Sequence, residues 1–458
     1  MSYDEAVRYL LSLGRELAAP RQARIQKFDL ANITALAEYL GSPHRASPCV
    51  HIAGTNGKGS TAAMLDSILR AAGLRTGLYT SPHLERINER IRVDGQEIPD
   101  SDFAASFARI EEAIETLMAS GALAAHPTYF ECLTAMAFDA FACAETDFNV
   151  YEVGMGGRLD ATNIVTPEVA VITQIDFDHE DYLGYSIEQI AAEKAGIIKP
   201  GGWVVSAAER PEARAIIARR AAELDARLIE IDTAYRVSNL RADAGRYCAT
   251  VASAHSSKTI SLELPLFGRF QVRNAVAALA TARLFTERGF PIHDGHIARG
   301  IASVNWPGRL ERLAERPDIY LDGTHNPAGA RELVAFWEER FAARKILLIY
   351  GAMRDKAVDE VAGLLFPRAG TVTLTEPRQA RAISAHVLAE MTGHLAHKFE
   401  VVSDPASALE RAIEIARPED VIFATGSLYL VGDLRSYWKA RIHAEKASVA
   451  SAHPAKRT

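Results

Sequence analysis

The chain has 458 residues, 48% hydrophobic and 24% charged, which is enough for two or three folded domains, and we expect two. Its formal net charge of −7 and its pI near 6.1 argue against a nucleic-acid surface as the main function. The four cysteines show no metal-ligand spacing, the amino terminus lacks a secretion signal, and no apolar run approaches the ~20 residues that span a bilayer. We therefore expect a cytoplasmic protein, by default a monomer, that binds neither nucleic acid nor membrane.

Apolar runs typical of strands alternate with helical patterns between residues 49 and 175. Runs that are apolar on both faces suit a parallel sheet covered by helices on both sides, whose ligands gather at the carboxyl ends of the strands. The sequence therefore predicts an α/β fold with a parallel sheet in this part of the chain. The predicted strands are residues 49–53, 76–80, 148–153 and 169–175, and the predicted helices include 61–72 and 130–142.

The stretch Val-His-Ile-Ala-Gly-Thr-Asn-Gly-Lys-Gly-Ser at residues 50–60 places a lysine among glycines between a strand and a helix. Small residues let backbone N–H groups face an anion, the helix start, expected at about Thr61, adds its positive end, and Lys58 supplies a cation. The strict P-loop pattern has no counterpart of Gly59 after the lysine. A glycine-rich turn with a solvated lysine is the alternative. The flanking strand and helix favour a cradle for the phosphates of ATP, made of Gly54, Thr55, Asn56, Gly57, Lys58, Gly59 and Ser60.

ATP chemistry needs Mg²⁺, whose preferred oxygen ligands must then stand beside the loop. Glu152 ends a strand just before a glycine-rich turn, and Ser81 closes the strand after the loop helix. His179 follows another strand within a cluster of carboxylates. Each has an ordinary alternative: a glutamate paired with a basic residue, a Ser-Pro turn and a hydrogen-bonded loop histidine. Together they predict metal ligands at one edge of the sheet.

A second alternation of strands and helices begins after a linker near residues 302–306. Its predicted strands are residues 319–321, 345–350, 370–375 and 420–424, with a helix at 329–341. This pattern predicts a smaller doubly wound, Rossmann-like domain over residues 307–441, following a P-loop-containing ATPase domain over residues 1–301. Residues 442–458 lack an apolar stripe, and we expect a flexible tail there.

The loop resembles the ATP loop of the Mur ligase superfamily, and within it the branch of dihydrofolate synthases and folylpolyglutamate synthases. Matching motifs extend over nearly the whole chain: Tyr-Thr-Ser-Pro-His at 79–83, Glu-Val-Gly-Met-Gly-Gly-Arg-Leu-Asp-Ala-Thr-Asn at 152–163, Asp-His at 178–179 and Asp-Gly-Thr-His-Asn-Pro at 322–327. Ser81, Glu152 and His179 match magnesium-ligating positions of this family. The resemblance thus implies a Mur ligase-type ATP-binding domain followed by a glutamate ligase domain.

Further site residues are implied by the resemblance alone. Lys194 lies in a segment, Glu-Lys-Ala-Gly-Ile-Ile-Lys-Pro, whose lysine carries a carbamate in the family and helps to hold a second magnesium ion; by composition it would be a solvated lysine. Asn274, Arg309 and Asp322 fall on nucleotide-contacting positions, and His325 falls near the phosphates or the incoming amino acid. We expect Lys58, Asp322 and His325 to be catalytic. Segments resembling the folate pocket contribute Phe28, Asp29, Leu30, Phe130, Gly157 and Arg158.

The resemblance implies an enzyme that activates a carboxylate with ATP as an acyl phosphate and joins it to the amine of L-glutamate. The acceptor is dihydropteroate, a tetrahydrofolate polyglutamate, or both. We favour a bifunctional enzyme, because residues 178–179 and the pocket segments resemble bacterial enzymes that use both acceptors; a folylpolyglutamate synthase alone is the alternative. A peptidoglycan-precursor ligase would need a nucleotide-sugar domain for which the ~48 residues before the loop are too few. A nucleotide-binding switch would not need two metal sites.

Overall fold

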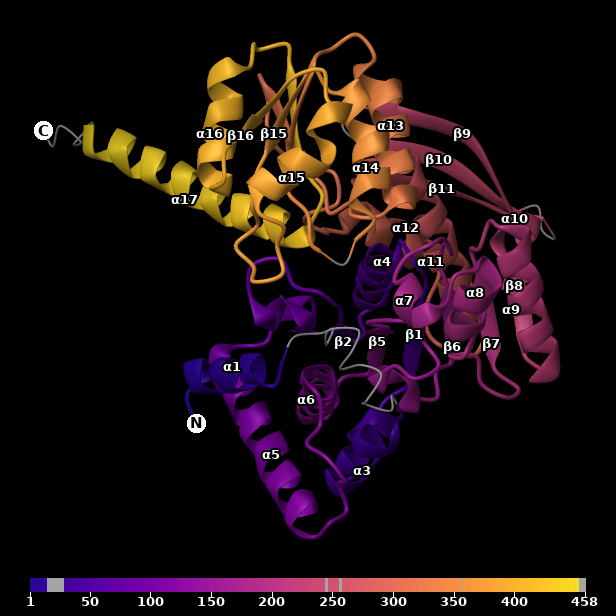
Figure 1. The fold of residues 1–458 in the computed structure, drawn as a ribbon. Coiled ribbons are helices and arrows are strands. Elements are labelled where there is room, and N and C mark those ends of the chain that lie inside the picture. The colour runs from indigo at the N-terminus through magenta and orange to yellow at the C-terminus, as the bar shows by residue number, and fades with distance from the viewer. Residues whose placement is uncertain (15–28, 244–245, 255–257, 355, 453–458) are drawn as a thin grey trace, which may run out of the picture. The chain divides into compact units, whose positions relative to one another are not determined.

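The structure is a computed structural model that describes the whole chain except residues 15–28, 244–245, 255–257, 355 and 453–458 (Figure 1). The chain divides into two compact units, Met1–Asn305 and Trp306–Thr458. Each unit is built of helices around a mainly parallel sheet, which confirms the predicted α/β fold class. Among the described residues, no helix is both long and apolar enough to cross a membrane.

The first unit contains an eight-stranded sheet in the order β4-β3-β2-β5-β1-β6-β7-β8. Six neighbouring strands of this sheet run parallel, namely β2, β5, β1, β6, β7 and β8. Strands β3 and β4 add an antiparallel edge beside β2. β1 lies between β5 and β6, and all of its residues are buried. The strands are β1 Cys49–Ala53, β2 Thr76–Tyr79, β3 Ile91–Val93, β4 Gln96–Glu97, β5 Phe148–Glu152, β6 Val169–Ile172, β7 Trp203–Ser206 and β8 Arg227–Glu230.

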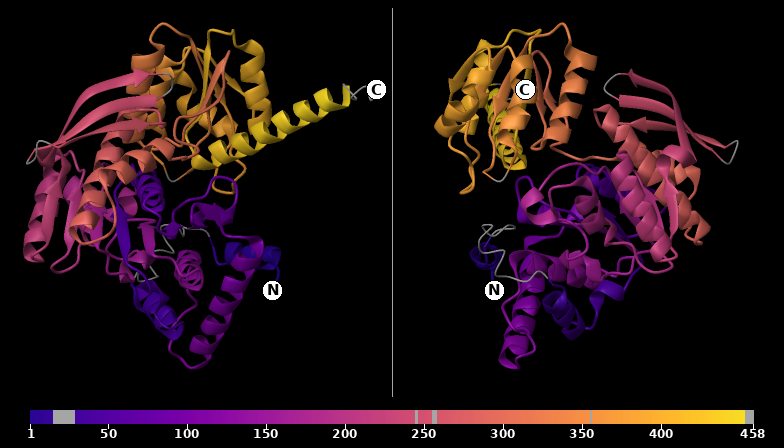
Figure 2. Two further views of the ribbon diagram at one scale, coloured as in Figure 1. Left: turned by 180° about the vertical axis from the view of Figure 1, so that it is seen from behind. Right: turned by 45° about the vertical axis from the view of Figure 1, so that its right-hand side comes forward.

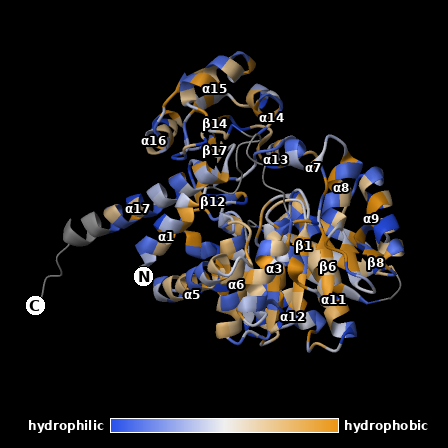
Figure 3. Cartoon of the chain, turned by 60° about the horizontal axis from the view of Figure 1, so that its bottom comes forward, coloured by the Kyte–Doolittle hydropathy of each residue, from blue (hydrophilic) through white to orange (hydrophobic). Residues whose placement is uncertain are grey.

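Helices pack against this sheet, with α4 in contact with β2, β5, α11 and α12, and with α5 packed on α6. Strands β1 and β6 are hydrophobic in Figure 3, whereas α9 mixes hydrophilic and hydrophobic residues, as expected of a helix that covers a buried sheet. The helices are α1 Tyr3–Ser12, α3 Ala31–Tyr39, α4 Lys58–Ala71, α5 Asp100–Ala119, α6 Tyr129–Cys143, α7 Glu180–Leu183, α8 Ile187–Ala195, α9 Pro211–Glu223, α10 Ile231–Ala234, α11 Arg269–Glu287 and α12 Asp294–Ser303, with 3₁₀ turns at Pro43–Arg45, Ile87–Arg90 and Ala161–Ile164.

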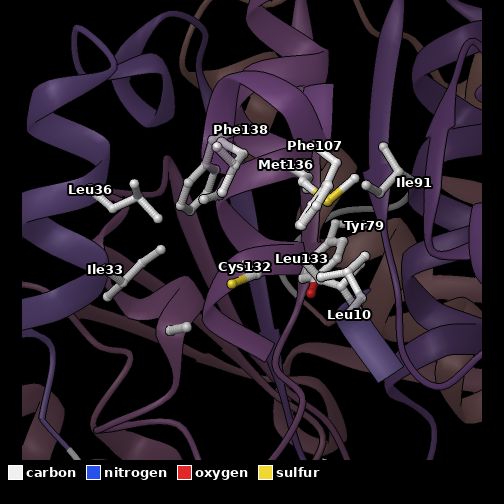
Figure 4. Packing of buried hydrophobic residues seen from close by; sticks show 14 of the residues in the cluster. Leu10, Ile33, Leu36, Tyr79, Ile91, Phe107, Cys132, Leu133, Met136 and Phe138 are labelled. Atoms are coloured by element: carbon white, nitrogen blue, oxygen red, sulfur yellow. The ribbon is translucent and has the colours of Figure 1, made fainter. Parts of the chain in front are cut away.

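The core of the first unit includes a cluster that joins α1, α3, α5 and α6 to strand β2. Figure 4 shows side chains of this cluster, among them Ile33 and Leu36 from α3, Phe107 from α5 and Phe138 from α6. Phe138 also packs edge-on against the Tyr151 ring of β5, with 5.3 Å between ring centroids. This apolar contact fixes α6, and with it Phe130 in the first turn of that helix, relative to the strand that ends at Glu152.

A separate three-stranded antiparallel sheet completes the first unit, and the sequence analysis did not predict it. Figures 1 and 2 show its long strands side by side, in the order β11-β10-β9. Its strands are β9 Tyr235–Asp243, β10 Arg246–Ser253 and β11 Thr259–Leu264. Burial alternates strictly along β11, where Ile260, Leu262 and Leu264 are buried, so a period-two signal was present in the sequence.

The second unit contains a six-stranded sheet in the order β12-β13-β17-β14-β15-β16, parallel except for β12. Its strands are β12 Glu311–Ala314, β13 Asp318–Leu321, β14 Ile346–Tyr350, β15 Thr371–Leu374, β16 Phe399–Val401 and β17 Val421–Thr425. Its helices are α13 Pro327–Phe341, α14 Val358–Leu365, α15 Ala385–Thr392, α16 Pro405–Ile415 and α17 Leu428–Ala452, with 3₁₀ turns at Phe366–Arg368 and Gly393–Leu395. Where a tail was predicted from residue 442, the helix α17 continues as far as Ala452, and residues 453–458 lie outside the described part.

Candidate active site

Four neighbouring parallel strands of the first unit, β2, β5, β1 and β6, end at one edge of the sheet. Ser81 follows β2, Glu152 is the last residue of β5, and His179 lies in the loop after β6. The segment after β1, residues 54–60, is called the phosphate loop below. Because the carboxyl ends of parallel strands meet, the sheet brings the loop and the three predicted metal ligands to the same edge.

The phosphate loop leads from β1 directly into α4, which begins at Lys58 rather than at Thr61 as the sequence predicted. Gly57 is the N-cap in a left-handed conformation (φ 87°), which a glycine adopts without strain and which starts the helix three residues earlier. Lys58 is therefore the first helical residue. The N-terminal backbone N–H groups of α4, which lack intrahelical acceptors, lie within the phosphate loop itself.

Hydrogen bonds to the segment after β6 hold the phosphate loop in place. The backbone N–H of Thr55 donates to the Gln174 carbonyl (2.7 Å), and the Thr55 hydroxyl donates to the Asp176 carbonyl (2.9 Å). The Thr173 hydroxyl donates to the carbonyl of Asn56 (2.7 Å). The loop is thus fixed by hydrogen bonds to the segment that follows β6.

Gly54 is required by a close approach. A Cβ atom built on Gly54 would lie 1.8 Å from the Thr173 hydroxyl oxygen, and the backbone has φ +155°. No larger residue fits while Thr173 keeps its bond to the loop. The glycine therefore allows the Thr173 side chain, just after β6, to reach the loop backbone.

Two lysine side chains meet at the Gly54 carbonyl oxygen. The ammonium of Lys58 donates to it at 3.0 Å and also to the Thr55 carbonyl at 3.2 Å, while the ammonium of Lys194 donates to it at 2.9 Å. Burial, and secondly the Lys58 charge, lower the pKa of Lys194 to about 7. Lys194 is thus not the solvated helix lysine that composition suggests, but a buried amine beside the phosphate loop.

Glu152 and Ser81 are in direct contact. One carboxylate oxygen of Glu152 accepts a hydrogen bond from the backbone N–H of Ser81 at 3.0 Å, and Glu152 is buried. His179 lies in the left-handed region (φ 53°) at the start of α7, with its Nε2 3.8 Å from a carboxylate oxygen of Asp178. The charge of Asp178 in turn raises the pKa of Lys194 against the larger effect of burial. This links the segment after β6 to the lysine at the loop.

Asn274 lies on α11 against the phosphate loop. A Cβ on Gly57 would come within 2.4 Å of the Asn274 amide oxygen. The Asn274 amide donates to Gln271 (2.9 Å), whose own amide donates to the Ser60 hydroxyl (3.2 Å). The sequence analysis did not single out Gln271, although an amide three residues before Asn274 on an otherwise apolar helix face was a usable signal.

The turn at residues 154–158 joins the metal candidates to the predicted folate pocket. Its first residue, Gly154, has room only for a hydrogen, because a Cβ there would lie 2.4 Å from the tip of the Phe130 ring. At its other end Arg158 forms an ion pair with Glu193 (2.8 Å), and Gly157 packs against the carbonyls of Glu193 and Lys194. The turn therefore contacts both the Phe130 ring and the last turn of α8.

The other predicted pocket segment is described only in part. Phe28 lies outside the described residues. Asp29 is exposed and accepts a hydrogen bond from the backbone N–H of Ala31 at the start of α3, and Leu30 is half-buried. The charge of Asp29 contributes to raising the pKa of Glu131, although burial is the main cause. Asp29 thus lies near the first turn of α6, which carries Phe130.

In the second unit, three predicted residues come together at the carboxyl end of β13. Asp322 accepts hydrogen bonds from the backbone N–H groups of Leu310 (2.9 Å) and Thr324 (3.0 Å). A Cβ on Gly323 would lie 2.5 Å from the Arg309 guanidinium, and one ring nitrogen of His325 is 2.8 Å from the Gly323 carbonyl. Asn326 caps α13 by accepting from Gly329 N–H. Arg309, Asp322 and His325 therefore form one cluster within this unit.

Comparisons with family models and with known proteins match both units of the chain. Residues 52–282 match the model of the Mur ligase middle domain, and residues 308–428 that of the Mur ligase, glutamate ligase domain. The chain is 35% identical over 429 residues to the dihydrofolate synthase/folylpolyglutamate synthase of Escherichia coli, covering 90% of this chain and 92% of that protein. A solved structure described as E. coli FolC in complex with DHPP and ADP matches with a TM-score of 0.84 and 33% identity, covering 96% of this chain and 98% of that one.

An archaeal relative is longer than this chain. The chain is 38% identical over 442 residues to a probable bifunctional folylpolyglutamate synthase/dihydropteroate synthase of Halobacterium salinarum. The match covers 96% of this chain but only 52% of that protein, so the chain spans about half the length of this relative.

Substitution of Gly54 tests the loop geometry. We expect Gly54→Ala to weaken binding of a fluorescent ATP analogue by at least about tenfold, or about 1.4 kcal/mol, because the new methyl group displaces Thr173 and the loop backbone. The control is Gly363→Ala in α14, where a Cβ meets nothing within 4 Å; this variant should bind as the wild type does. Unchanged affinity of the Gly54 variant would contradict the proposed close approach.

Proposed function

This chain belongs to the Mur ligase family, and we propose that it is an ATP-dependent ligase that joins L-glutamate to dihydropteroate and to the γ-carboxyl group of tetrahydrofolates. The observation that carries the proposal is the phosphate loop. Thr173 fixes its backbone, and the Lys58 ammonium lies against its Gly54 and Thr55 carbonyls. A relative named for both activities and a similar structure solved in complex with DHPP and ADP support this proposal. The alternative with only one of the two activities, a folylpolyglutamate synthase, is distinguished by the experiment below.

The reaction must turn a carboxylate oxygen into a leaving group. A carboxylate oxygen of the acceptor attacks the γ-phosphorus of ATP, the bond to ADP breaks, and an acyl phosphate forms. The amine of L-glutamate then attacks the acyl carbon, loses a proton and expels phosphate, which leaves the amide. The Lys58 ammonium and the N–H groups at the start of α4 offset the negative charge on the transferring phosphoryl group.

The residues at the sheet edge fit Mg²⁺ because they offer oxygen donors beside a phosphate cradle. Ser81 and Glu152, already in contact, would hold one ion, and His179 with a carbamoylated Lys194 would help to hold a second. Bound there, magnesium supplies positive charge to the phosphates. The described residues contain no cluster of three or more His, Cys, Asp or Glu side chains arranged for a metal.

Carbamoylation of Lys194 is supported by the state of its amine. Carbon dioxide reacts with a neutral amine, and the pKa of about 7 leaves about half of the Lys194 side chains neutral at pH 7. The carbamate would replace one of two cations at the Gly54 carbonyl by an anion next to Lys58. Two like charges at one oxygen would thereby become an attractive pair.

The remaining predicted residues receive roles in the same proposal. Phe130, Asp29 and Leu30, with Phe28 outside the described residues, would line the pocket of the pterin acceptor, and Gly157 and Arg158 would contact it. In the second unit, Arg309 and Asp322 would bind the nucleotide, and His325 would act on the phosphates or the incoming glutamate. The four cysteines form no disulfide, which supports a reducing compartment such as the cytoplasm, and a monomer suffices because one chain carries the whole set.

The proposal is tested by magnesium-dependent ADP release with L-glutamate, measured in parallel with dihydropteroate and with tetrahydrofolate. We expect release with both acceptors. Release with tetrahydrofolate alone would establish a folylpolyglutamate synthase only. ATP that binds but is not hydrolysed with either acceptor would overturn the proposal.

Removal of the Lys58 charge should affect turnover and not folding. We expect Lys58→Ala to lower kcat by about 10²–10³-fold, the usual loss of one charge-stabilising donor at a reacting centre, with an unchanged circular dichroism spectrum. Lys258→Ala, which removes an exposed lysine of the same unit, should leave kcat within about twofold. Full activity of the Lys58 variant would contradict the role of this residue at the phosphates.

The state of Lys194 can be observed directly. With ¹³CO₂ we expect a carbamate signal in the ¹³C NMR spectrum of the wild type that is absent from Lys194→Ala. Because only the neutral amine reacts, its rate of formation should rise with pH and fall to about a fifth between pH 7 and pH 6, as the neutral fraction drops from about a half to about a tenth. Activity of Lys194→Ala should be partly restored by added acetate, whereas a fully active variant without acetate would contradict the carbamate.

A further inference from the structure

A buried histidine lies inside the first unit, in the strand that leads to the phosphate loop. His51, the central residue of β1, is fully buried, and its neighbours across the sheet are Tyr151 of β5 and Ala170 of β6. Its Nε2 is 2.7 Å from the hydroxyl oxygen of Thr162, whereas its Nδ1 has no hydrogen-bond partner among the described residues. Burial, and secondly the charge of Lys199, lower the pKa of His51 to about 3, so the ring is neutral near pH 7.

The direction of this bond follows from the next group in line. The Thr162 hydroxyl donates its single proton to a carboxylate oxygen of Asp160 in a short hydrogen bond. The hydroxyl oxygen is then left to accept from His51, so His51 carries its proton on Nε2. The result is a chain of three side chains from the central strand of the sheet: His51 donates to Thr162, which donates to Asp160.

Asp160 is the end of this chain and accepts from four donors. Besides the hydroxyl and backbone N–H of Thr162 (3.0 Å to the latter), it accepts from the backbone N–H groups of Gly154 (3.0 Å) and Met155 (3.1 Å). Burial raises the pKa of Asp160, and these hydrogen bonds oppose that rise. One oxygen thus holds Thr162 and the other holds the turn at residues 154–158.

Gly154 is the residue of this turn that contacts Phe130 of the proposed acceptor pocket. Its α-carbon faces the Phe130 ring so closely that a Cβ would lie 2.4 Å from it, and Glu152 is only two residues earlier. A shift of the Gly154 backbone must therefore move the ring, the glutamate or both. The hydrogen bonds between the phosphate loop and the segment after β6 are made by Thr173, Gln174 and Asp176, none of which belongs to the chain from His51 to Asp160.

We propose that His51 is a positioning residue for the acceptor: through Thr162 and Asp160 it fixes the 154–158 turn against Phe130, and so sets how the pterin acceptor is bound. The inference rests on the proposed function, because it takes Phe130 to line the acceptor pocket. A histidine held only for packing would gain nothing from its imidazole, since an apolar side chain would avoid burying an Nδ1 atom without a partner.

The test compares three variants of His51 in the full-length protein. In His51→Leu, which removes the donor, we expect the KM for dihydropteroate or tetrahydrofolate to rise about tenfold or more, with the Kd of an ATP analogue within about twofold of the wild type. His51→Gln, whose amide nitrogen replaces Nε2, should restore the KM to within about threefold. His51→Asn, whose shorter amide does not reach Thr162, should resemble the leucine variant.

A second pair guards against a leucine variant that does not fold. Thr162→Val breaks the chain at its middle and Thr162→Ser keeps the hydroxyl, so only the valine variant should raise the acceptor KM. Two results would show that His51 only packs the core and would overturn the inference. One is an acceptor KM that is equal in His51→Leu and His51→Gln and equal in Thr162→Val and Thr162→Ser. The other is a loss of ATP affinity in the same proportion as the loss of acceptor affinity.

The hydrogen-bond chain can also be tested without any turnover. In ¹⁵N-histidine-labelled protein, the signals that disappear in His51→Gln should show a protonated Nε2 and a bare Nδ1. The opposite tautomer would overturn the chain. Silence of the wild type with both acceptors would instead count against the proposed function, and the tautomer would then still decide whether His51 donates to Thr162.

Discussion

Two ammonium groups meet at one carbonyl oxygen, that of Gly54, and the site is organised around this constraint. Lys58 reaches it from the first turn of α4 and Lys194 from the last turn of α8, so helices on either side of the loop converge on a single backbone atom. Two positive charges that share one hydrogen-bond acceptor repel each other, and burial adds to the free-energy cost of charging Lys194. This cost lowers the pKa of the buried Lys194 to about 7, so that part of it is neutral near pH 7.

The parallel sheet explains why these groups can meet at all. The phosphate loop follows β1, and the strands on both sides of β1 contribute Glu152 and the segment 173–179. Residues more than a hundred positions apart are therefore placed side by side by strand order alone: the Thr173 hydroxyl bonds to Asn56 across 117 residues of sequence. Functional groups gather at the carboxyl edge of such a sheet because the loops that follow the parallel strands, and the N-termini of the helices after them, lie there.

The sequence predicted what is local and missed what depends on pairing. The glycine and lysine pattern of residues 54–60 and the strand-end residues Ser81, Glu152 and His179 were identified because each pattern is contiguous, and the structure places them at one edge. Thr173 and Gln271 were not identified, since their partners in the phosphate loop lie far away in the sequence; Gln271 bonds to Ser60 across 211 residues. The helix start was placed at Thr61 because the left-handed Gly57, which caps α4 earlier, leaves no distinctive trace among several glycines. The antiparallel sheet of β9–β11 was missed although its alternation is regular.

The same device recurs at the two ends of the candidate site. After β1, the missing side chain of Gly54 makes room for Thr173; after β5, that of Gly154 makes room for Phe130. In each case a turn that follows a strand is locked by a side chain from another element, so the turn has its position before any ligand arrives. A site fixed in this way does not need to order its loops on binding, and the free energy of binding can serve orientation of the reacting groups instead. Glycine thus contributes rigidity here: by leaving space, it lets a neighbouring side chain occupy the place where a mobile turn would otherwise have its freedom.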